Sequence, residues 1–152
     1  MEKRKGKYMN HEETVRLLRE CNSGIKMGVY ALNEVLPKVR SAPLADILVH
    51  GRQEHERLGN ETHAMLRHYN DPDKEPNAMA KGMAKMKTDM KLMVAPGDET
   101  VADLITDGCH MGIKSLSRYL NQYPQAEECV RDLTGRLIRL EEEMATGIRP
   151  YL

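Results

Sequence analysis

The strongest constraint on the fold is a seven-residue apolar repeat close to the end of the chain. Its side chains fall on one face of an α-helix, because a helix turns once in about 3.6 residues. The residues on this face are Ala126, Val130, Leu133, Leu137, Leu140, Met144 and Tyr151. An apolar stripe of this length is buried against neighbouring helices, so the repeat predicts a helix packed within a bundle.

Four further segments show helical periodicity. A first helix is expected over residues 11–39, with a kink or end near Leu36 because Pro37 lacks a backbone donor. Ser41 and Pro43 mark the start of a second helix, over residues 43–69. A shorter helix follows over residues 77–94, and a fourth begins with Asp98 as its N-cap and ends before the turn at residues 121–124.

No segment alternates apolar and polar residues in the manner of a strand. The sequence therefore predicts an all-α fold: an antiparallel four-helix bundle with a short methionine-rich helix inserted between the second and third long helices. We expect one domain over residues 11–152, preceded by a flexible basic tail at residues 1–10.

Composition narrows the class of protein. The 152 residues carry 23 basic and 23 acidic side chains, so no net field favours nucleic acid or an anionic membrane. Trp and Phe are absent, which removes the usual platforms for base stacking. Three widely spaced cysteines argue against a disulfide framework or a zinc finger. These features predict a soluble, cytoplasmic protein without a membrane or nucleic-acid partner.

Five residues are candidate metal ligands. His50 and Glu54 lie one turn apart on the second helix, with Glu61 two turns after Glu54. Asp107 and His110, on the penultimate helix, have the acid-x-x-His spacing found in carboxylate-bridged di-metal bundles. Together they could bind iron, manganese or zinc. The alternative is that Glu54 and Glu61 form ion pairs with Arg57, Arg19 or Lys26, while the histidines of this helix are solvated.

Five methionines recur at helical spacing in the inserted helix: Met79, Met83, Met86, Met90 and Met93. Thioethers can bind copper(I), but a single stripe is more typical of core packing or of an adaptable protein-binding face. If the stripe is exposed in the monomer, we expect it to be a dimer surface. A homo-oligomer, with a dimer as the first hypothesis, is therefore the predicted assembly.

Two Gly-xxx-Gly pairs lie within helices, where each glycine costs about 1 kcal/mol relative to alanine. They are Gly24 with Gly28 and Gly108 with Gly112. The pairs predict close helix approach or room for a bulky neighbour, and we expect the first and penultimate helices to cross near them.

Several diffuse features resemble the ferritin-like superfamily, and most closely the small bacterial ferritin-like domains called DUF2383. The likeness covers residues 14–148 and lies in Asn22-Ser23-Gly24-Ile25, Ala31, Glu54, Glu61 and the segment 108–119. The resemblance implies a four-helix bundle. In iron-using members it also implies inward-facing Glu residues on two helices and Glu-x-x-His on the other two.

This chain departs from that ligand pattern. Glu54, Glu61 and Glu141 are followed three residues later by Arg57, Ala64 and Met144 rather than by histidine. We therefore expect a ferritin-like bundle of unknown biochemical role, a non-catalytic binding or oligomerising module rather than an enzyme. The alternative is a metal-binding ferritin-like protein with a degenerate carboxylate and histidine site.

Overall fold

The computed structural model describes residues 2–71 and 78–152, and all regular structure in these residues is helical. The elements are α1 (Glu2–Val35), η1 (Leu36–Lys38), α2 (Ala42–His68), α3 (Ala78–Val94), α4 (Asp98–Gln122), α5 (Glu128–Ile148) and η2 (Arg149–Tyr151). The prediction of an all-α fold with five α-helices is confirmed for this part of the chain. Residues 72–77, between α2 and α3, lie outside the described residues.

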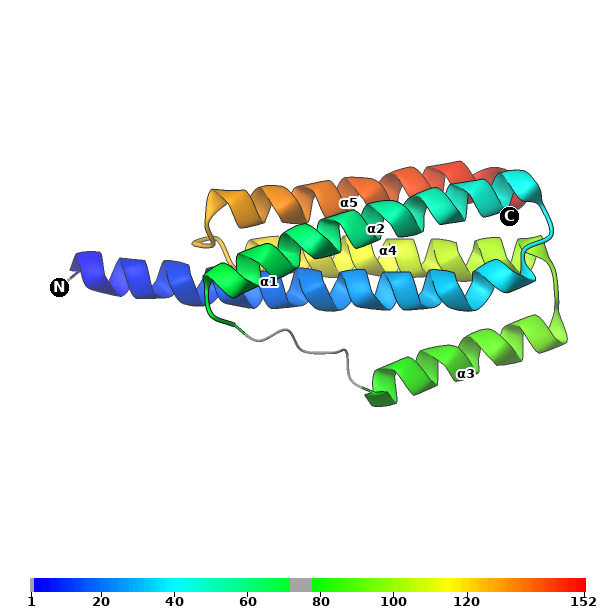
Figure 1. The fold of residues 1–152 in the computed structure, drawn as a ribbon, viewed down its shortest axis with the longest axis horizontal. Coiled ribbons are helices and arrows are strands. Elements are labelled where there is room, and N and C mark those ends of the chain that lie inside the picture. Colours follow the sequence, from blue (N-terminus) through cyan, green and yellow to red (C-terminus); the bar gives the residue numbers. More distant parts are fainter. Residues whose placement is uncertain (1, 72–77) are drawn as a thin grey trace.

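The four long helices lie alongside one another, and α3 lies to one side of them (Figure 1). In this view α1 and α5 run in one direction, and α2 and α4 run in the other. Among the long helices, contacts join α1 with α2, α4 with α5, α2 with α5, α1 with α4, and α1 with α5. Fully buried leucines fill the space between them, among them Leu18, Leu48, Leu133 and Leu137. Burial of these side chains is the main stabilising term of the fold.

The breaks between helices lie close to the predicted positions. Helix α1 ends at Val35 and a short 3₁₀ turn containing Pro37 follows. The side chain of Ser41 caps α2 by accepting a hydrogen bond from the amide of Leu44, at 3.3 Å. The prediction for Asp98 was wrong in detail, because the N-cap of α4 is Gly97. The carboxylate of Asp98 instead accepts hydrogen bonds from the backbone amides of Arg40 and Ser41, at 2.8 and 2.9 Å.

The first helix extends through most of the predicted basic tail. Helix α1 begins at Glu2, so residues 2–10 are helical rather than frayed. Figure 1 shows this end of α1 projecting beyond the other helices. The side chains of residues 5–8 and of Asn10 are exposed. Backbone hydrogen bonding continued from the packed part of α1 can support this extension.

None of the described helices is long and apolar enough to cross a membrane.

Candidate functional site

The structure does not bring the five candidate metal ligands together. His50 is exposed on α2, and Asp107 and His110 are exposed on α4. Glu54 is half-buried and lies 3.4 Å from the guanidinium of Arg57. Helix α2 packs on α1 and α5, whereas α4 packs on α1, α3 and α5. Among the described residues, no group of three or more His, Cys, Asp and Glu side chains is arranged to hold a metal ion.

Glu61 forms an ion pair between α2 and α5. Its two carboxylate oxygens accept hydrogen bonds from both terminal nitrogens of Arg136, at 2.8 and 2.5 Å. These bonds lower the pKa of Glu61 and raise the pKa of Arg136. The alternative of ion pairing is therefore observed for Glu61, and also for Glu54, which contacts Arg57 as predicted. The hydrogen-bond partner of Glu61 is Arg136, 75 positions further along the chain, which was not among the basic residues named from the sequence.

A different histidine and a different glutamate meet inside the bundle. His55 of α2 is only 1% exposed, and its Nε2 lies 2.5 Å from Oε1 of Glu141 of α5. The Nδ1 of His55 lies 2.7 Å from the carbonyl oxygen of Gly51. The expectation that the histidines of this helix are solvated was wrong for His55. A buried imidazole needs hydrogen-bond partners, and these two contacts supply them.

The positions of the protons follow from the chemistry of the two acceptors. The carbonyl of Gly51 can only accept, so the Nδ1 of His55 carries a proton. A second proton lies between Nε2 and the Glu141 carboxyl group. Burial by itself lowers the pKa of His55. The hydrogen bond and charge of Glu141, together with the Gly51 carbonyl, outweigh that effect and raise the pKa overall. The geometry therefore favours an imidazolium–carboxylate pair.

Glycines make the space for this pair. A Cβ atom at Gly28 of α1 would lie 3.0 Å from Cδ2 of His55, and one at Gly112 of α4 would lie 3.6 Å from Cδ of Glu141. Gly24 and Gly108, the other members of the two predicted pairs, have no heavy atom within 4 Å of such a Cβ. One glycine of each pair thus makes room for a bulky neighbour. The Gly-xxx-Gly signal was the feature of the sequence that could have located the site.

A thiol completes this polar cluster. Cys109 of α4 is buried, and burial together with the nearby Glu141 carboxylate raises its pKa. We call His55, Cys109 and Glu141 the buried polar cluster. It joins α2, α4 and α5 and is backed by Gly28 of α1, so it links all four long helices. Its groups can hold and share a proton, but two of them already bond to each other.

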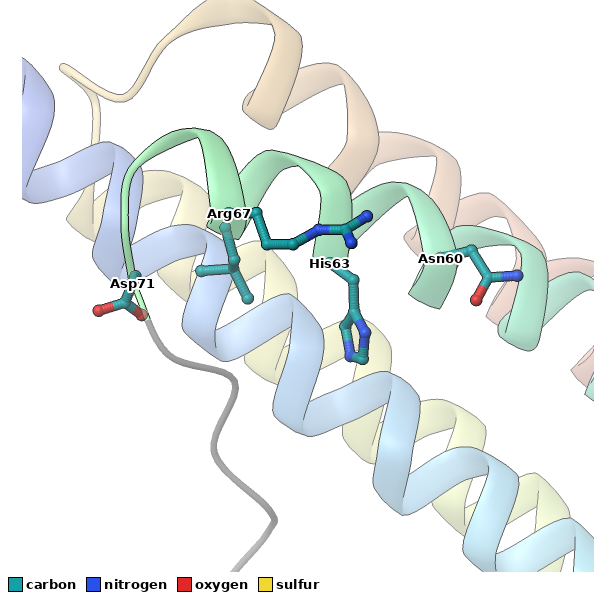
Figure 2. A pocket seen from close by; sticks show the side chains of 5 residues that line it. Asn60, His63, Arg67 and Asp71 are labelled. Carbon is teal, nitrogen blue, oxygen red and sulfur yellow. The ribbon is translucent and has the colours of Figure 1, made fainter.

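Two surface hollows lie away from this cluster. The first, near the end of α2, is lined by Asn60, His63, Leu66, Arg67 and Asp71 (Figure 2). In the figure, His63 points toward α1 and the side chain of Arg67 extends along α2. Asp71 is bonded to Arg19 of α1 and so is not free for a ligand. The second hollow is lined by Lys38, Arg40, Asp89, Leu92, Met93, Pro96 and Gly97.

The most prominent surface feature is on α3. Met83, Met86, Met90 and Met93 are 62–81% exposed, and we call these four residues the methionine face. The side chain of Met79 lies outside what the structure describes. Spacings of three and four residues place the four thioethers on one side of α3. The expectation of core packing was therefore wrong for these residues, and the alternative of an exposed face is the one observed.

Helix α3 is attached to the bundle by its other side. Leu92 is buried there, and the ammonium group of Lys85 lies 2.9 Å from the Glu34 carboxylate of α1. The ammonium of Lys81 lies 5.6 Å from the centre of the Tyr30 ring. Most of these attachments are polar, so α3 turns its apolar side away from the protein.

Family models, curated protein sequences and solved structures were each compared with this chain, and none of the three comparisons gave a match.

Proposed function

We propose that the protein is a non-catalytic helical bundle that docks another protein chain through the methionine face, and that the occupant is a second copy of this chain. The observation that supports this proposal is the exposure of four methionines on one side of α3. Contiguous exposed apolar surface on a protein commonly marks an interaction site. Methionine suits such a surface, because its unbranched side chain adapts to the shape of a partner.

The free energy of apolar burial favours a partner chain that covers the methionine face. Burial of apolar surface contributes roughly 25 cal/mol per Å² removed from water, so covering four thioether side chains is favourable. The exposed ion pairs that attach α3 contribute little by comparison. The zero net charge of the chain supports a second copy as the partner, because two copies approach without long-range repulsion.

Sedimentation measured over a wide range of protein concentration tests the proposal. The wild-type chain should shift from monomer to dimer as concentration rises. A variant with Met83, Met86, Met90 and Met93 all replaced by Gln should stay monomeric, because its face is polar. Met111→Gln is the matched control, since Met111 is exposed on α4 and does not belong to the face. It should dimerise like the wild type.

Two results would overturn this proposal. One is a wild-type chain that stays monomeric at every concentration. The other is a folded Gln variant, with unchanged helical circular dichroism, that dimerises as strongly as the wild type.

We further propose that the four long helices form an antiparallel ferritin-like bundle with α3 as an insertion. The order of the elements and the alternating directions of α1, α2, α4 and α5 in Figure 1 support it. Distances between spin labels at the ends of these helices would test the arrangement. Labels at residues 40 and 150 should be close together, and labels at residues 40 and 70 should be far apart.

Metal binding is the second candidate function, and the observation in its favour is the buried imidazole of His55 beside the partly buried carboxylate of Glu141. The fit is incomplete, because these two groups bond to each other and no third described ligand completes a site. If this function is correct, protein purified without a tag contains near-stoichiometric iron, manganese or zinc. Glu141→Ala should then lose the ion and Glu54→Ala should keep it. Folded wild-type protein without metal would refute this alternative.

A further inference from the structure

The sulfur atoms of this chain differ sharply in how accessible they are. The methionine face gathers four exposed thioethers on one helix, whereas Met144 of α5 is only 5% exposed. Met111 is also exposed, but it lies on α4 and is not part of this face. The chain thus contains a clustered exposed set, an exposed methionine outside the cluster and a buried methionine.

Two of the three thiols are shielded from oxidants: Cys21 and Cys109 are buried, whereas Cys129 is exposed. A thiol reacts with peroxide as its thiolate, and that form becomes scarce when the pKa rises. Burial raises the pKa of Cys21 to about 11. Burial and Glu141 raise the pKa of Cys109, and partial desolvation and Glu127 raise the pKa of the exposed Cys129. A thioether has no proton to lose, so its reaction does not depend on a pKa, and exposed sulfurs are oxidised before buried ones.

We propose that the methionine face is a site of reversible oxidation by hydroperoxides, and that its oxidation switches docking off; the second half of this inference rests on the proposed function. In the reaction, a thioether sulfur attacks one oxygen of the hydroperoxide and the O–O bond breaks. The attacked oxygen becomes the sulfoxide oxygen. The proton of the attacked oxygen is transferred to the other oxygen, which leaves as water or an alcohol. Sulfur loses two electrons and the peroxide gains them.

The spacing of the four methionines makes this chemistry effective. Each sulfoxide is polar, so every oxidation removes apolar surface from the same side of α3. Several oxidations would convert the face from apolar to polar without disturbing the leucine core. A docked partner would cover the sulfurs, so the free chain is the form that reacts. Methionine sulfoxide reductases could restore the face, which makes the change reversible.

Limited treatment of the full-length chain with hydrogen peroxide tests the site, with sulfoxides located by peptide mass spectrometry. Met83, Met86, Met90 and Met93 should oxidise at least about tenfold faster than Met144, because a buried sulfur reacts only when the structure opens. The measurement is made at a protein concentration too low for association. Equal rates at Met144 and at the face would overturn the proposed site.

A leucine variant tests the switch. Replacing Met83, Met86, Met90 and Met93 by Leu keeps the face apolar but removes its reactive sulfur. Wild-type dimer should dissociate after peroxide treatment, whereas dimer of the Leu variant should persist. Loss of the Leu dimer under the same treatment would refute the switch. If neither chain dimerises before treatment, the proposed function fails, and the mass-spectrometric result still decides the oxidation site.

Discussion

Helices α3 and α5 carry apolar residues at the same spacing, but the apolar stripe is buried in α5 and exposed in α3. In α5, Leu133, Leu137 and Met144 are buried among the other long helices. In α3, the four residues of the methionine face are exposed. The opposite, more polar side of the helix, which includes Lys85, contacts the bundle. The comparison teaches that a helical apolar stripe shows which residues share a face. It does not show whether that face is covered within the same chain.

The physical reason lies in what each helix has available to contact. Helix α5 packs on α1, α2 and α4, so its leucine stripe is surrounded. In the described part of the chain, α3 packs on α1 and α4, and α1 presents Glu34 and Tyr30 to it. Lysines of α3 satisfy these groups, and this orientation turns the methionines outward. Three predictions test or sharpen this difference.

The largest effect is expected from truncating one stripe and not the other. Leu137 is fully buried, so Leu137→Ala should lower the free energy of unfolding by about 2–5 kcal/mol. Met90→Ala on the exposed face should change it by no more than about 0.5 kcal/mol. Urea denaturation at a concentration where the chain is monomeric measures both. A loss for Met90→Ala as large as that for Leu137→Ala would show that α3 buries its methionines in solution.

A smaller effect separates two glycines of α1 that sequence alone treats as equivalent. Gly28→Ala places a methyl group against the buried His55 ring and should destabilise the protein by about 1–3 kcal/mol. Gly24→Ala meets no neighbour and should stabilise it by up to about 1 kcal/mol through helix propensity. Thermal and urea unfolding of the two variants measure the difference. Equal effects of the two substitutions would contradict the position of His55.

The smallest expected effect is a pH dependence of stability that arises from Glu141 of α5 and its partner His55. Glu141 raises the pKa of His55, which burial alone would lower, and the pKa in the folded state lies above the ordinary value of 6.5. Protonated His55 therefore stabilises the fold fully below about pH 6.5, and this contribution is lost as pH rises through the raised pKa. The urea midpoint should decline over this interval.

Glu141→Gln provides the control for that experiment. Without the carboxylate charge, the midpoint of the variant should decline less steeply with pH than that of the wild type. The quadruple Gln variant of the methionine face should keep the wild-type slope, because the face contains no titrating group. Identical slopes for the wild type and Glu141→Gln would show that the pair does not carry the pH dependence.

Local chemistry explains which features were predictable from the sequence. Pro37 lacks an amide proton and Ser41 can cap a helix, so these residues located the break between α1 and α2. The prediction of a metal site relied on the spacing of residues along single helices. Such spacing does not show which residues of two different helices lie near each other, and the structure does not bring the candidate ligands together. Glu61 bonds to Arg136, and His55 bonds to Glu141, where α2 packs against α5. No short-range pattern encodes those pairings.

The sequence by itself determined that this chain is helical, where its helices break and which residues share each apolar face, because these properties depend on neighbours within a few turns. It also supplied the glycines that leave room for a buried pair. Only the tertiary structure decided that His55 and Glu141 fill that room and that the methionine face is exposed. Those outcomes depend on which helices lie side by side, and that is set by the packing of the whole chain.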